Sequence, residues 1–221
     1  MPGPFSESGA ARLAGAACDA IEALAASLAD QPTDRAGIRL HGIAPLAALL
    51  DGHGRIGAQI VPFGGAGARP VRAILFDKSE HRNWALAWHQ DRTICVRTRH
   101  DVPGFGPWTV KAGLVHVAPP FDLIERLITI RIHLDHVPED NAPLLIAPGS
   151  HRLGMVREDA IEKAVAACGA YACLADAGDI WVYATPILHA SAAAVTPRRR
   201  RVLQVDYAAF DLPGGLIWSG I

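Results

Sequence analysis

The pattern of hydrophobic and polar residues changes character near residue 70. Before that point, apolar residues recur at steps of three and four: Leu13, Ala17, Ile21, Leu24 and Leu28. This spacing draws one apolar stripe and predicts a helix over residues 8–30, ended by the segment Gln31-Pro32-Thr33-Asp34. We also predict a short helix over Ile43–Leu50, and a short strand over Ala58–Val61 inside a glycine-rich loop.

After Pro70 the apolar runs become short and are separated by Pro, Gly and Asp. The β-like runs are Val71–Phe76, Thr93–Thr98, Leu127–Leu134, Ile180–Tyr183 and Val202–Phe210, with helical interruptions at Asp122–Leu127 and Glu158–Ala167. A helical N-terminal part followed by many short strands favours a mainly β fold with flanking helices, a double-stranded β-helix (jelly roll, cupin-like). We expect a single domain over 1–221, with 1–70 as helical support and 71–221 as the jelly-roll core.

One predicted strand alternates completely. Its aliphatic face carries Ile128, Ile130, Ile132 and Leu134, and its polar face carries Thr129, Arg131, His133 and Asp135. On a half-exposed sheet the polar face would be solvated. In a jelly roll whose outer face is covered by helices, the same polar face would line the barrel interior. The sequence leaves both interpretations open.

Composition excludes several classes of protein. The 221 residues are 50% hydrophobic and carry a formal net charge of -1, which gives nothing that favours nucleic acid or an anionic membrane. No apolar run is long enough to cross a bilayer. The four cysteines form no CxxC pair and no zinc spacing, so we expect reduced thiols and a cytoplasmic location.

The candidate chemistry begins with His89 and Asp91 in Trp88-His89-Gln90-Asp91. Residues two apart on an extended segment point the same way, so both side chains can reach one metal ion. Together with His189 they match the two-histidine, one-carboxylate set that holds non-haem Fe(II). A second HxD, His133-Leu134-Asp135, shows that the tripeptide alone is weak evidence.

Three further segments follow in order: Asp140–His151 with Asn-Ala-Pro-Leu and Pro-Gly-Ser-His, then Ala177–Val182, then His189-Ala190-Ser191 with Arg200 eleven residues after His189. Together with Trp-His-Gln-Asp, this ordered set resembles the phytanoyl-CoA dioxygenase family of Fe(II)- and 2-oxoglutarate-dependent oxygenases. The resemblance runs from about Trp84 to Tyr207.

The resemblance implies that His89, Asp91 and His189 hold iron, and that Arg200 and Ser191 bind the far carboxylate of the cosubstrate 2-oxoglutarate. A guanidinium suits that task because it makes a bidentate, charge-assisted pair with a carboxylate. The reaction would use O₂, release succinate and CO₂, and hydroxylate an unactivated C–H bond of a small molecule. Desaturation, epimerisation and demethylation are alternative outcomes.

The chain departs from the family pattern at two positions. Ala142 stands where the family usually has Gly, and Ala194 stands where it often has Asn. Both positions bear on substrate contacts more than on iron. Asp91 is intact, which argues against a halogenase. Of the four arginines 198–201, one or two are expected to point inward, and a shift of one residue would flip the face.

Substrate contacts are predicted for Arg97, Arg131 and His133. Arg97 and Arg99 share parity with the metal ligands if one strand continues through residue 99, which would indicate an anionic substrate; the alternative is ordinary surface charge. Arg131 and His133 either line the site or belong to a salt-bridged edge strand. Phe105, Trp108 and Lys111 form either a lid over the substrate or plain packing.

Two readings outside the oxygenase class stay open. One is a jelly-roll metal-binding or sensor protein without turnover, although such a relative would be expected to have lost a ligand or Arg200. The other is a zinc hydrolase on the same ligands, against which the spacing from His189 to Arg200 speaks. The sequence identifies neither the substrate nor the oligomeric state.

Overall fold

The computed structural model describes residues 3–32, 35 and 37–221, and its architecture rests on three antiparallel sheets. The six-stranded sheet has the spatial order β1 (Ala10–Leu13), β11 (Ile180–Ala184), β8 (Ile128–His133), β13 (Arg200–Ala208), β3 (Arg69–Lys78) and β2 (Gly37–Leu40). The four-stranded sheet has the order β10 (Tyr171–Cys173), β9 (Leu144–Ile146), β12 (His189–Ser191) and β4 (Leu86–His89). These two sheets form the jelly roll expected from the sequence.

The third sheet and the helices surround this barrel. The sheet has the order β5 (Ile94–Val96), β7 (Leu114–Val117) and β6 (Trp108–Lys111). The α-helices are α1 (Phe5–Ser8), α2 (Ile21–Ser27), α3 (Ala44–Leu50), α4 (Val61–Gly64), α5 (Phe121–Glu125) and α6 (Ile161–Cys168). Short 3₁₀ turns are η1 (Cys18–Ala20), η2 (Gly57–Gln59), η3 (Ser150–Leu153) and η4 (Glu158–Ala160).

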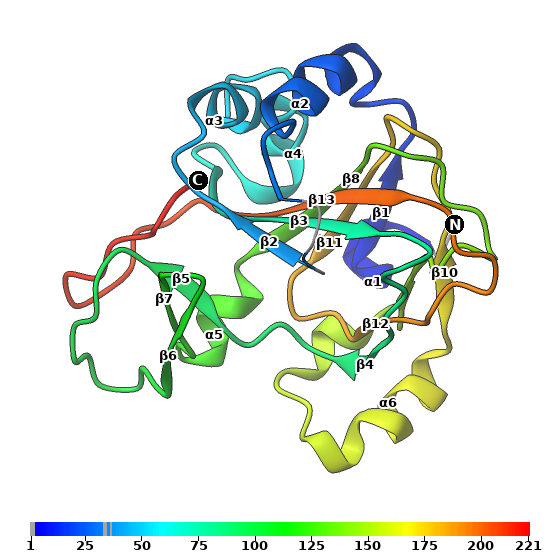
Figure 1. The fold of residues 1–221 in the computed structure, drawn as a ribbon. Coiled ribbons are helices and arrows are strands. Elements are labelled where there is room, and N and C mark those ends of the chain that lie inside the picture. The colour runs from blue at the N-terminus through cyan, green and yellow to red at the C-terminus, as the bar shows by residue number, and fades with distance from the viewer. Residues whose placement is uncertain (1–2, 33–34, 36) are drawn as a thin grey trace.

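The main hydrophobic core lies on the outer face of the six-stranded sheet. Figure 1 shows α2, α3 and α4 on this side and the four-stranded sheet on the other. Leu24, Leu46 and Leu50 of the helices pack on Ile130 and other aliphatic residues of the sheet. Side chains alternate across a strand, so the covered outer face leaves the opposite face of each strand for the barrel interior.

The strand β8 follows this alternation as predicted. It lies between β11 and β13, so it is a central strand rather than an edge strand. Thr129, Arg131 and His133 are all buried on the inner face. The solvated-face reading of this strand is therefore wrong, and its polar side chains belong to the barrel interior.

The N-terminal part differs from the prediction. Instead of one helix over 8–30, residues Ala10–Leu13 form β1, which pairs with β11, and the helix α2 begins only at Ile21. Gly15 has a φ of +65°, a left-handed conformation that no regular α-helix contains. The predicted end at Thr33 and Asp34 lies outside the described residues, whereas the helix predicted over Ile43–Leu50 is confirmed by α3.

Two other elements bear on the sequence reading. The strand predicted over 58–61 is wrong, because Ala58 and Gln59 belong to η2, Ile60 is a turn residue, and Val61 begins α4. The residues 1–70 also contribute β1 and β2 to opposite edges of the large sheet, so they are not only helical support. The runs predicted near β3, β5, β8, β11 and β13, and the helical interruptions near α5 and α6, are confirmed.

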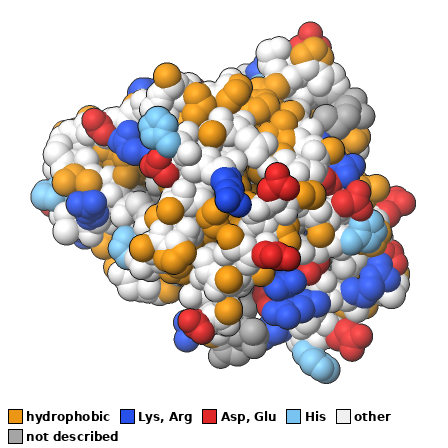
Figure 2. All heavy atoms as spheres, turned by 90° about the horizontal axis from the view of Figure 1, so that it is seen from above, with side chains coloured by type: hydrophobic (Ala, Val, Ile, Leu, Met, Phe, Trp, Pro, Cys, Tyr) orange, Lys and Arg blue, Asp and Glu red, His pale blue; other side chains and the backbone are white. Residues whose placement is uncertain are grey.

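The surface and the cysteines fit the composition. Seen from above the helices, acidic and basic side chains are interspersed with hydrophobic ones (Figure 2). Cys18, Cys95, Cys168 and Cys173 are all free thiols, as predicted. Within the described part of the chain, no helix has the length and apolarity needed to cross a membrane.

Candidate metal and cosubstrate site

The three predicted metal ligands meet inside the barrel. His89 ends β4 and His189 begins β12, and the two residues are direct partners in the antiparallel pairing of these strands. Their ring centroids are 4.3 Å apart. Asp91 follows two residues after His89, and one ligand atom from each of the three residues lies within 4.8 Å of the others. The structure thus brings together residues that are a hundred positions apart in sequence.

Hydrogen bonds to the backbone orient both imidazoles. The Nδ1 of His89 lies 2.8 Å from the carbonyl oxygen of Ala87, and the Nδ1 of His189 lies 3.0 Å from that of Ile187. A carbonyl oxygen only accepts, so each Nδ1 carries the proton and each Nε2 keeps its lone pair free. This arrangement fits a divalent metal, because a histidine ligand needs its other nitrogen held in this way.

The charges around the ligands also suit a metal. Burial alone would raise the pKa of Asp91, but the charge of Arg72 and the nearby histidines lower it to about 2, so the carboxylate is ionised. Burial lowers the pKa of His189 to about 4, against the opposing charge of Asp91. At neutral pH the site therefore offers one anionic oxygen and neutral imidazole nitrogen.

Asp91 is held from the other side by two residues of the large sheet. The Arg72 guanidinium donates to its Oδ2 at 3.4 Å, and the Gln204 amide donates to the same atom at 3.2 Å. Gln90, between the two ligands, turns away and bonds the 154–156 segment and the Pro186 carbonyl, as predicted for the residue that alternates with them.

A basic cavity adjoins the metal ligands. It is lined by Phe76, Lys78, Trp84, Leu86, Arg131, Leu144, His189, Ala190, Ser191 and Arg200. Lys78, Arg131 and Arg200 are all buried. None of these three cations has a carboxylate within ion-pair distance among the described residues. We name this region the anion pocket.

Of the four consecutive arginines, only Arg200 faces this pocket. Its side chain is 2% exposed, and it donates to the carbonyl oxygen of Ala142 at 2.6 Å while its Nε has no partner. Arg199 pairs with Asp77 and Arg201 pairs with Asp135 on the outer side of the sheet. Burial and the charge of Arg131 lower the pKa of Arg200 to about 9.

Lys78 is a pocket residue that the sequence analysis missed. Its Nζ donates to the carbonyl oxygens of Trp84 and Ala192 and, at 3.0 Å, to the Oγ of Ser191. All three acceptors are neutral, and burial with the charges of Arg200 and Arg131 lowers its pKa to about 7. No clean polar alternation marks it, because Arg72 and Lys78 share one face of β3 with Ile74 and Phe76.

The second HxD does not form a second metal site. His133 is fully buried inside the barrel, and neither ring nitrogen has a hydrogen-bond partner. Asp135 instead pairs with Arg201, outside the strand, at 2.7 Å. Arg131 lines the anion pocket and donates to the Tyr183 hydroxyl and the Gln204 amide oxygen. The interpretation of residues 131–135 as a salt-bridged edge strand is wrong, because β8 lies in the middle of the sheet. The expected salt bridge does exist, between Asp135 and Arg201.

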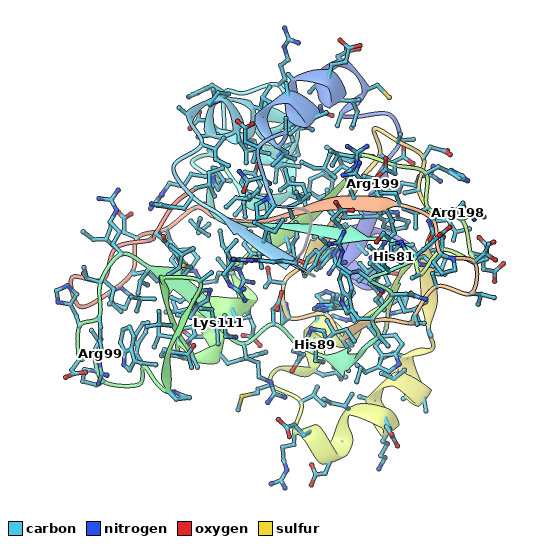
Figure 3. The ribbon with its side chains drawn as sticks, viewed as in Figure 1. His81, His89, Arg99, Lys111, Arg198 and Arg199 are labelled. Carbon is cyan, nitrogen blue, oxygen red and sulfur yellow. The ribbon has the colours of Figure 1, made fainter. Side chains whose placement is uncertain are left out.

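Arg97 and Arg99 lie away from the metal ligands. The expectation of one strand through residue 99 is wrong, because β4 and β5 belong to different sheets. Arg97 is exposed and lines a separate hollow with Asp211 and Trp218. Figure 3 shows Arg99 at the outer end of the lobe formed by β5–β7, far from His89.

The predicted lid is not a loop. Trp108 and Lys111 are the ends of β6, and Phe105 and Trp108 pack against the second apolar cluster, around Val96 and Val117. The packing alternative therefore applies to the two aromatic residues. Lys111 is exposed and lies on the side of the lobe toward His89 (Figure 3).

The two departures from the family pattern have a structural consequence. Ala142 adopts a φ of +52°, which costs an L-residue with a Cβ about 1–2 kcal/mol. Its carbonyl oxygen accepts from Arg200, so the strained residue helps to position the pocket arginine. Ala194 has its backbone N–H and carbonyl bonded to the side-chain amide of Asn83, which therefore supplies an amide at this point from another segment.

Solved structures share this fold at low identity. EctD from S. alaskensis, solved with 2-oxoglutarate and 5-hydroxyectoine, has a TM-score of 0.65 and 19% identity over 93% of this chain and 73% of its own. AviO1 from Streptomyces viridochromogenes has a TM-score of 0.62 and 20% identity over 95% and 92%. The α-ketoglutarate-dependent epimerase SnoN from nogalamycin biosynthesis has a TM-score of 0.61 and 16% identity over 96% and 87%.

No curated protein matches the chain at the sequence level. The sequence profile of the phytanoyl-CoA dioxygenase family, in contrast, matches residues 66–202, more than half of the chain. That range contains all three predicted metal ligands, and also Lys78, Ser191 and Arg200. The chain therefore belongs to the phytanoyl-CoA dioxygenase family of iron- and 2-oxoglutarate-dependent oxygenases.

Proposed function

We propose that this enzyme hydroxylates an unactivated C–H bond of a small molecule. His89, Asp91 and His189 would hold Fe(II), and the anion pocket would hold 2-oxoglutarate. When bound, iron and 2-oxoglutarate supply the oxidising chemistry, in which O₂ converts 2-oxoglutarate to succinate and CO₂ and leaves one oxygen atom in the substrate.

The observation that supports this proposal is the uncompensated charge of the anion pocket. Burying a cation without a partner is costly, so three buried cations facing one cavity indicate a ligand that brings negative charge. 2-Oxoglutarate carries two carboxylates. One would lie toward His89, Asp91 and His189, and the other would be held by Arg200, Lys78 and the Ser191 hydroxyl.

The protein residues have separate tasks in this scheme. Arg72 and Gln204 keep the Asp91 carboxylate ionised and fixed toward the histidines. The backbone carbonyls of Ala87 and Ile187 accept from Nδ1, so each neutral imidazole has its Nε2 lone pair available to a metal. Arg200 fixes the far end of the cosubstrate. The substrate C–H bond would then be held next to the site formed by His89, Asp91 and His189.

The first experiment is an anaerobic titration of Fe(II)-loaded protein with 2-oxoglutarate, read by the weak visible absorption of the iron–keto-acid chelate. We expect a band in the wild type that is lost in His89→Ala and needs much more 2-oxoglutarate in Arg200→Ala. No band in folded, iron-loaded wild-type protein would overturn the proposal. The mass of the product from a later substrate screen separates hydroxylation from desaturation, epimerisation or demethylation.

A further inference from the structure

One face of the three-stranded sheet carries several polar residues. Cys95 and Thr109 both pair with His116, and Lys111 shares their side because it lies two residues after Thr109. The opposite face carries Ile94, Val96 and Val117, which belong to the second apolar cluster. The polar face is therefore not needed for that packing.

His116 is the central residue of this face and has an unused nitrogen. Its side chain is 1% exposed, its Nδ1 bonds the carbonyl oxygen of Leu114 at 3.0 Å, and its buried Nε2 has no partner. Burial lowers its pKa, and the charges of Arg72, Arg39 and Lys111 act in the same direction. The charges of three basic residues thus act on this ring.

Arg39 approaches the same place from the large sheet. It pairs with Ile74 in the register of β2 and β3, on the side that carries Arg72 and Phe76, which is the inner face. Its Nε is buried without a partner, and no described carboxylate lies within ion-pair distance of Arg39 or Lys111. We name Arg39, Arg72, Lys111 and His116 the basic cluster.

The basic cluster adjoins the metal ligands on the side opposite the anion pocket. Arg72 contacts Asp91 directly, at 3.4 Å, and also bonds the Thr93 carbonyl oxygen at 3.1 Å. Arg72 and Lys78 lie near opposite ends of β3, so the two basic regions are separated along the strand. Figure 3 places Lys111 on the side of the β5–β7 lobe that lies toward His89.

The charges of the interior do not balance even with the metal and cosubstrate bound. Five basic side chains (Arg39, Arg72, Lys78, Arg131 and Arg200) face two carboxylates, Asp91 and Asp206. A divalent iron and a doubly charged 2-oxoglutarate cancel each other. A surplus of positive charge is left, and Arg39 carries its share of it on the substrate side.

We propose that the substrate is an organic anion, whose carboxylate or phosphate group is bound by Arg39, His116 and Lys111 while its C–H bond faces the metal. This inference rests on the proposed function. Its residues are not those from which the sequence suggested an anionic substrate, since Arg97 and Arg99 lie elsewhere.

The test uses small probes on protein loaded with Mn(II) and 2-oxoglutarate, so that the metal and the anion pocket are occupied without turnover. Acetate, methyl phosphate and neutral acetamide are titrated by calorimetry into the wild type, Arg39→Gln and Lys111→Gln. Arg97→Gln is the matched control, because it removes the same charge from an exposed arginine outside the cluster. Comparing the affinities for acetate and methyl phosphate shows whether the site prefers a carboxylate or a phosphate group.

We expect acetate or methyl phosphate, but not acetamide, to bind the wild type, and Arg39→Gln to weaken that binding at least fivefold while Arg97→Gln leaves it unchanged. Equal binding in wild type and Arg39→Gln, equal loss in Arg97→Gln, or no anion binding at all would overturn the inference. Lys111→Gln, at an exposed position, provides the answer if Arg39→Gln does not fold.

The same variants keep the two proposals apart. If Arg39→Gln forms the iron–keto-acid chelate but loses anion binding, both proposals hold. If the wild type forms the chelate but Arg39→Gln binds the anions as tightly as the wild type, only the substrate inference fails. If the wild type forms no chelate, the proposed function fails, whatever the anion titration shows.

Discussion

The two ends of the barrel interior differ in whether their buried basic side chains are paired with carboxylates. At one end Arg72 lies between Asp206 and Asp91, with nitrogen–oxygen distances of 2.5 and 3.4 Å. At the other end Lys78, Arg131 and Arg200 face one cavity with no described carboxylate in ion-pair reach. The paired end has its counter-ions within the chain, whereas the unpaired end needs them from a ligand. The first would therefore fix a metal ligand, and the second would bind an anion, as proposed above.

The largest effect is expected at the paired end. Asp206→Ala leaves Arg72 buried with half of its compensation and also removes the acceptor of the Thr129 hydroxyl. Breaking a buried pair in this way should lower the free energy of unfolding by about 3–5 kcal/mol. Urea denaturation of the metal-free protein measures it. Asp211→Ala, which breaks the exposed pair with Arg69, should cost less than about 1 kcal/mol. Equal losses of unfolding free energy in Asp206→Ala and Asp211→Ala would contradict the view that the buried pair matters more than the exposed one.

The unpaired end should show the reverse behaviour. Arg200→Met removes an uncompensated buried charge, so the metal-free protein should change in stability by no more than about 1 kcal/mol. Its affinity for 2-oxoglutarate should fall by about 2–5 kcal/mol, roughly thirtyfold or more, because a buried charge-assisted contact is lost. The chelate titration measures this loss. Arg199→Met is the control, and a matching loss there would contradict the placement of Arg200.

Lys78 should make the affinity of the anion pocket for 2-oxoglutarate depend on pH. Burial and the charges of Arg200 and Arg131 lower its pKa to about 7. A bound dianion favours the charged form and raises that pKa, so binding takes up a proton above pH 7. The affinity for 2-oxoglutarate should therefore fall as the pH rises from about 7 to 9, by about tenfold per unit at most. Lys78→Met should bind more weakly and lose this slope; an unchanged slope would assign the titration to another group.

The smallest effect concerns the backbone that holds Arg200. Ala142→Gly relieves the positive φ, worth about 1–2 kcal/mol, and removes one buried methyl group, worth about 0.8 kcal/mol. We expect a net gain in unfolding free energy of about 1 kcal/mol or less, with 2-oxoglutarate affinity kept. Thermal unfolding measures the gain. A clear loss of stability would show that the methyl packing outweighs the strain.

The sequence predicted which three side chains come together because their signal is local and ordered. His89, Asp91 and His189 stand in motifs whose order along the chain is informative, and the alternation of β8 identified its buried polar face. Arg39, Arg72 and Lys78 were missed because their strands mix basic with aliphatic residues on the inner face, so no clean polar alternation marks them. Only the register of β2, β3 and β13 brings these cations to the ligands.

The helix predicted over 8–30 is a different kind of error, because the sequence pattern indicated an element that the structure does not contain. Its alanine- and leucine-rich stripe has helical spacing, but Ala10–Leu13 pairs with the open edge of β11. Arg12 also pairs with Asp179, far along the chain, and the Gly15 amide donates to the same carboxylate. Such tertiary contacts outweigh local helix propensity and are invisible in the spacing of apolar residues.

Each of the two imidazoles takes its orientation from a carbonyl two residues earlier in the chain. The orientation of both imidazoles thus depends on hydrogen bonds within residues 87–89 and 187–189, and not on the surrounding loops or the three-stranded sheet. Evolution can therefore rebuild the substrate side without disturbing how the histidines present their lone pairs. A single metal-binding core can in this way be inherited by enzymes with unrelated substrates.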